Sequence, residues 1–204
     1  MLETGWNRDD RVLQVNSFFF RKAMAHELVQ EWAVSSPRHQ LSYNIPLFRD
    51  GRTGLGDAML SYRYQVAGDP GSRVGVAPRL SLILPTRSAR FGERSSGLQL
   101  SVPLSVSITP RLTSHTNVAV TWYRDREAGE VNAAQSVAFA VTGRMAVAVD
   151  ASYTRCNEGS QVLVVRPGVQ FTIDGPRGLQ ISPGVAFPNG GGVLFLIALE
   201  QPIP

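Results

Sequence analysis

Apolar and polar residues alternate along long stretches of this chain. In GLQLSVPLSVSITP (97–110), every even-numbered position from Leu98 to Ile108 is apolar, and most odd-numbered positions are serine or glutamine. Successive side chains of a β-strand point to opposite faces of the sheet, so this pattern predicts strands with one apolar and one polar face. The class of the protein depends on which of the two faces is the inside.

About twelve segments of this kind follow one another. Most are long enough to cross a bilayer as tilted strands, which takes about 9–11 residues, whereas strands of globular proteins usually have about 5–6. A short helix at 21–32 (RKAMAHELVQEW) is an alternative for one stretch. The predicted strands are 12–21, 27–35, 39–48, 55–66, 73–85, 97–110, 112–123, 135–142, 145–154, 162–173, 179–187 and 193–200.

Short and long connections alternate between these segments. Short turns on one side and longer, charged loops on the other are typical of transmembrane barrels. We expect loops 86–96 and 124–132 to gate the barrel. The short connections are SSPR (35–38), TPR (109–111), GR (143–144) and DGPR (174–177), and the long ones are 86–96, 124–132, 154–160 and 187–192.

The composition of the polar face favours a lumen over a water-exposed exterior. It is rich in Ser, Thr, Asn and Gln with isolated charges, whereas an exterior sheet usually carries many Lys and Glu, and Lys22 is the only lysine. We therefore predict an all-β fold with one domain (1–204), an antiparallel up-and-down transmembrane β-barrel of about twelve strands. A soluble lipocalin-like barrel with the apolar face inside is the alternative.

The polar face supplies the candidate lumen-lining residues. A charge inside a small barrel must be paired or hydrated, because unpaired burial costs several kcal/mol. The charges among these residues are nearly balanced, so they form either a structural network or a constriction that sorts permeants by charge. The candidates are Glu27, Glu31, Asn44, Asp57, Arg63, Arg79, His115, Asn117, Asp150, Arg166, Gln170, Gln180 and Glu200.

Composition argues against several other functions. The net charge of +4 comes from scattered residues and not from a basic stripe, which disfavours nucleic-acid binding. Cys156 is the single cysteine and the three histidines lack ligand spacing, so we expect no metal site, and no cofactor. His115 with Asn117 is too weak a pattern to predict an enzyme.

The N-terminal sequence MLETGWNRDD has no recognisable signal peptide. An exported protein needs one. Either this is a mature or truncated form, or translation starts upstream, or the protein is not exported.

Several segments resemble the family named for the MetA pathway of phenol degradation. They are 31–47 (EWAVSSPRHQLSYNIPL), 54–65 (GLGDAMLSYRYQ) and 77–86 (APRLSLILPT), with similar patterns at 97–112 and 182–202. The resemblance implies a bacterial outer-membrane barrel that takes up hydrophobic or aromatic compounds. Its expected partners are outer-membrane lipid, a small-molecule permeant and, during biogenesis, the barrel-assembly machinery.

The function we predict is that of an outer-membrane channel for small, apolar or aromatic compounds. A barrel with only a structural role in the envelope and a soluble binder of a hydrophobic ligand are the alternatives.

Overall fold

The computed structural model describes residues 4–7, 11–20, 23–69, 71–124, 129–157, 159–173 and 178–203. These residues form a 14-stranded sheet and one short 3₁₀ helix, η1 (Ala89–Phe91). The strands are β1 (Arg11–Phe20), β2 (Ala23–Val34), β3 (Ser36–Asp50), β4 (Arg52–Leu55), β5 (Ala58–Tyr64), β6 (Val74–Val76), β7 (Arg79–Leu84), β8 (Gly97–Thr109), β9 (Leu112–Tyr123), β10 (Gly129–Thr142), β11 (Met145–Cys156), β12 (Gln161–Thr172), β13 (Gln180–Pro188) and β14 (Leu194–Ile203).

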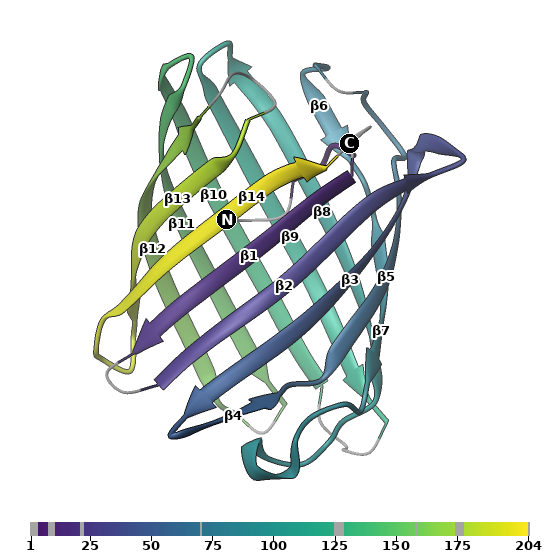
Figure 1. Ribbon diagram of the computed structural model, residues 1–204. Coiled ribbons are helices and arrows are strands. Elements are labelled where there is room, and N and C mark those ends of the chain that lie inside the picture. The colour runs from purple at the N-terminus through teal and green to yellow at the C-terminus, as the bar shows by residue number, and fades with distance from the viewer. Residues whose placement is uncertain are drawn as a thin grey trace.

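The sheet closes on itself into a barrel (Figure 1). Each strand pairs antiparallel with its neighbours, and β1 pairs with both β2 and β14. The strands β4 and β5 both pair with β3, and β6 and β7 both pair with β8. Each of these pairs is one interrupted strand, so the wall has twelve strand positions, which confirms the predicted fold class. No helix in the described part of the chain is long and apolar enough to cross a membrane.

The apolar face of each strand is the outside of the barrel. In β8, Leu98, Leu100 and Val102 are 45%, 43% and 42% exposed, while Ser101 and Ser105 are 1% and 0% exposed. Residues directly opposite each other on paired strands share a face. The register therefore continues the polar inner face from strand to strand, as in the row Glu31, Ser42, Ser61, Ser81, Gln99 and Thr121. This arrangement is the reverse of a soluble barrel and is that of a membrane barrel.

The two ends of the barrel differ in their connections. Tight turns at 35, 110–111 and 143–144 join strands at the end where β1 begins and β14 ends, the upper end in Figure 1, and the longer connection 65–73 between β5 and β6 lies at this end too. The long loop 85–96 between β7 and β8 lies at the opposite end, which we call the loop end, together with the tight turn at Gly51. The loop between β7 and β8 contains η1, and residues 125–128 of the second predicted gating loop lie outside the described residues.

Some predicted boundaries are wrong, for local reasons. The strand β2 begins at Ala23, so residues 23–32 form strand and no helix, because β1 and β3 pair along both of its edges. The strand β10 begins at Gly129 and not at Gln135, so half of the loop predicted at 124–132 belongs to the wall. Its first residues include Gly, Asn and Ala, which have low intrinsic strand preference, but β9 and β11 pair with them.

Candidate functional site

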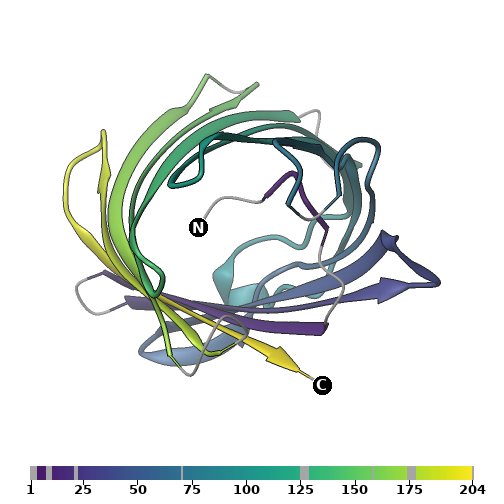
Figure 2. The same ribbon diagram turned by 90° about the horizontal axis from the view of Figure 1, so that it is seen from above.

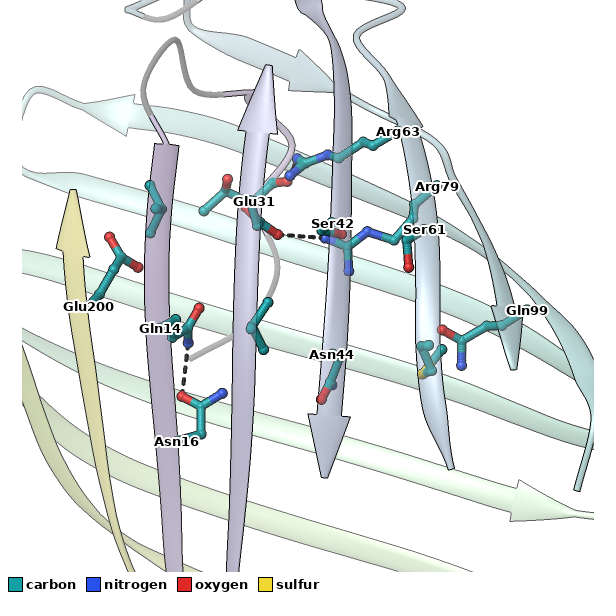
Figure 3. A pocket seen from close by; sticks show the side chains of 14 residues that line it. Gln14, Asn16, Glu31, Ser42, Asn44, Ser61, Arg63, Arg79, Gln99 and Glu200 are labelled. Carbon is teal, nitrogen blue, oxygen red and sulfur yellow. Dashed lines mark hydrogen bonds and ion pairs between the residues drawn. The ribbon is translucent and has the colours of Figure 1, made fainter. Parts of the chain in front are cut away.

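A polar cavity of about 240 Å³ lies inside the barrel against the wall formed by β14, β1, β2, β3, β5, β7 and β8 (Figure 3). Its lining side chains come from alternate positions of these strands, so the same period that makes the outside apolar makes the cavity polar. The lining residues are Thr4, Val12, Gln14, Asn16, Val29, Glu31, Ser42, Asn44, Met59, Ser61, Arg63, Arg79, Gln99 and Glu200.

An ion pair crosses this cavity. Nη2 of Arg79 donates to Oε1 of Glu31 over 3.0 Å, and both side chains are 19% exposed. Gln40 donates to the other carboxylate oxygen over 3.2 Å. Arg63 lies directly opposite Arg79 in the β5–β7 register. Two like charges opposite each other destabilise a sheet, so the carboxylate of Glu31 offsets part of their repulsion.

The N-terminal segment Thr4–Asn7 lies inside the ring of strands (Figure 2). The backbone N–H of Gly5 donates to Oγ of Ser105 over 2.6 Å, and Nε2 of Gln65 donates to the Gly5 carbonyl over 2.7 Å. Arg63 donates to the carbonyls of Thr4 and Trp6. These contacts join the segment to β5, to the residue that follows it and to β8, and hold its backbone inside the lumen against this part of the wall.

His115 belongs to the same contact region. Its Nδ1 lies 2.6 Å from Oγ of Ser105, and its ring meets that of Trp6 edge-on with centroids 6.1 Å apart. Asn117, two residues further along β9, is buried on the same face, opposite Pro103. His115 thus packs against the N-terminal segment and is joined to β8 through Ser105. Among the described residues, no three His, Cys, Asp or Glu side chains form a group that could hold a metal ion.

A second group of predicted lumenal residues lies on the strands β11, β12 and β13. Asp150 of β11 and Arg166 of β12 are directly opposite each other. Arg166 also shares a cavity of about 190 Å³ with Glu27 of β2. Gln170 donates to Gln180 on the neighbouring strand β13. Of the predicted residues, Glu31, Asn44, Arg63, Arg79 and Glu200 line the first cavity, and Glu27 and Arg166 line the second. Asn16 borders both cavities.

Asp57 has a different environment from the other predicted residues. It lies between β4 and β5 and ion-pairs with Arg87 of the β7–β8 loop, with 2.9 Å between Nε and Oδ2. Its Oδ1 accepts from the backbone N–H of Arg87 over 3.1 Å. Asp57 thus fixes this loop to the wall.

The loop end of the lumen is apolar on one side. A cavity of about 230 Å³ opens there between β1, β2, β3, β14 and η1. The rings of Phe48 and Phe91 lie 5.6 Å apart, and the guanidinium carbon of Arg90 lies 4.7 Å from the Phe91 ring centre. The cavity is lined by Phe18, Ala23, Met24, Ala25, Phe48, Arg49, Asp50, Phe91 and Leu194.

Solved structures share this architecture. The COG4313 outer membrane channel from Pseudomonas putida F1 superimposes with a TM-score of 0.78, at 11% identity over 100% of this chain and 97% of that chain. The NanC porin gives a TM-score of 0.74 at 10% identity, covering 95% of this chain and 100% of that chain. The KdgM porin gives 0.74 at 8% identity, covering 95% and 99%.

No family model and no curated protein matches the sequence. At these identities the structural likeness shows the fold, which is a porin-like β-barrel. The resemblance to the MetA-pathway family stays a prediction.

Proposed function

We propose that this protein is an outer-membrane channel for small apolar or aromatic compounds, which enter at the loop end. Closed antiparallel barrels with an apolar exterior and short turns on the side of the termini are typical of bacterial outer membranes. The loop end would then face the cell exterior, and the turns and termini would face the periplasm.

The apolar cavity at the loop end is the observation that carries the choice of permeant. Burying apolar surface is favourable by about 25 cal/mol per Å², so a lining of Phe18, Phe48, Phe91 and Leu194 retains an apolar molecule arriving from water. A channel for hydrophilic solutes needs no such lining at its mouth. The loop that contains η1 contributes Phe91 and is fixed by the Asp57–Arg87 pair, so it shapes this mouth.

Uptake of a hydrophobic fluorescent probe by intact Gram-negative cells tests the proposal. Cells that express the protein should take up N-phenyl-1-naphthylamine faster than cells with an empty vector. Phe48→Ser should slow this uptake several-fold, because it removes most of one aromatic wall of the cavity. Phe195→Ser is the matched control, since Phe195 points to the outside of β14 and is 61% exposed.

Each variant must first show the gel-mobility shift between unboiled and boiled samples that marks a folded barrel. Wild-type uptake no faster than the empty vector would refute the channel function and favour the alternative of a purely structural envelope barrel. Equal effects of the two serine variants would refute the role of the apolar cavity.

A further inference from the structure

Between the apolar cavity and the middle of the barrel lies the cavity that contains Arg166. Its volume is about 190 Å³. Phe18 lines both cavities, and Leu196 follows Leu194 on the same face of β14, so the apolar surface continues from one cavity into the next. The inner cavity differs by adding two charged groups, the carboxylate of Glu27 and the guanidinium of Arg166.

The hydrogen-bonding capacity of this cavity is incompletely used within the described residues. Nε of Arg166 is buried and has no acceptor there. Asp150, which lies outside the lining of this cavity, faces Arg166 from the neighbouring strand β11, and its Oδ1 is buried without a donor. Glu27 accepts from Nδ2 of Asn16 at 3.4 Å, beyond the usual range for such bonds. Buried polar groups are normally satisfied, and each unsatisfied one costs about 1–3 kcal/mol.

The charges of the three groups select the chemistry of a ligand. A carboxylate ligand would accept from Arg166 but would be repelled by Glu27 and Asp150. An ammonium ligand would donate to Glu27 but could not accept from Arg166. A hydroxyl group donates one hydrogen bond and accepts others, so it satisfies both partners without adding a charge.

We propose that Arg166 and Glu27 form a hydroxyl-binding subsite, and that the permeants are apolar molecules carrying a hydroxyl group. The apolar body occupies the cavity lined by Phe18 and Phe48, and the hydroxyl accepts from Arg166 and donates to Glu27. This inference rests on the proposed uptake of apolar compounds and adds the polar group that these compounds carry.

Binding to the protein in lipid nanodiscs tests the subsite. Four probes share one apolar body: methylcyclohexane, cyclohexylmethanol, cyclohexanecarboxylate and cyclohexylmethylammonium. Equilibrium dialysis, with empty nanodiscs subtracted, should give cyclohexylmethanol the highest affinity. Arg166→Met should weaken its binding about ten- to a hundredfold, the loss expected for a hydrogen bond to a charged group, and leave methylcyclohexane unchanged. Glu27→Gln should weaken it less, because the amide can still accept.

Arg111→Met, in the exposed turn between β8 and β9, is the matched control and should change nothing. The gel-mobility shift checks the folding of every variant. Tighter binding of the carboxylate or the ammonium than of the alcohol would overturn the inference, as would an unchanged alcohol affinity in folded Arg166→Met. If the alcohol and methylcyclohexane bind equally, the subsite fails while the proposed function stands. If none of the four binds, the proposed function fails as well.

Discussion

The ion pair between Glu31 and Arg79 should contribute measurably to the stability of the barrel. Glu31→Gln keeps the shape of the side chain and removes its charge. It removes the charge attraction between Glu31 and Arg79, while Arg79 stays directly opposite Arg63. Removing one partner of a buried pair costs about 3–5 kcal/mol. Because both side chains retain 19% exposure, water screens the remaining charge, and we expect a loss of about 2–3 kcal/mol.

Urea unfolding of the protein in phospholipid vesicles, followed by tryptophan fluorescence and by gel mobility, measures this change. The double variant Glu31→Gln/Arg79→Met should be more stable than the sum of the single losses by about 1–2 kcal/mol, because it removes both charges. Glu93→Gln in the exposed β7–β8 loop is the control and should change stability by less than about 0.5 kcal/mol. A Glu31→Gln effect as small as that of Glu93→Gln, with no coupling to Arg79, would show that the ion pair does not stabilise the barrel.

Two further predictions concern the segments attached to the wall. A Cβ added at Gly75 would collide with the Trp6 ring. The substitution Gly75→Leu should therefore displace the N-terminal segment, make Trp6 more accessible to acrylamide quenching and raise the single-channel conductance. Unchanged quenching would contradict the position of the segment. The substitution Asp57→Asn removes the charge that holds Arg87. Hydrogen exchange and protease cleavage in the loop 85–96 should therefore accelerate, while the strands stay protected. Unchanged protection of this loop would contradict its attachment to the wall.

The barrel wall was predictable because its signal is periodic and local. Each strand of the wall repeats the apolar–polar alternation, and the fixed period of two assigns every residue to a face once one position is known. Glu31, Arg79 and Arg166 could be placed on the polar face in this way. Which of them meet could not be predicted, because partners on the inner face depend on how the strands are staggered around the closed barrel.

The contacts of non-strand segments were beyond the reach of this pattern. Thr4–Asn7 is too short to show a period, and its partners Gln65 and Ser105 lie 58 and 100 residues away from the groups that they bind. Asp57 could be identified as a charge at a polar position, but its partner Arg87 lies in a loop, where alternation gives no orientation. The small residues Gly5 and Gly75, at which a Cβ would collide, were the available signal for close approach.

Spin labelling along β8 shows directly whether the apolar face of the strand contacts lipid and its polar face lines the lumen. In a Cys156→Ser background, single cysteines would replace Leu98, Gln99, Leu100 and Ser101 and carry a nitroxide in lipid vesicles. We expect an alternation of period two, with Leu98 and Leu100 accessible to oxygen dissolved in lipid and Gln99 and Ser101 shielded from it. The opposite phase, or equal accessibility at all four positions, would contradict it.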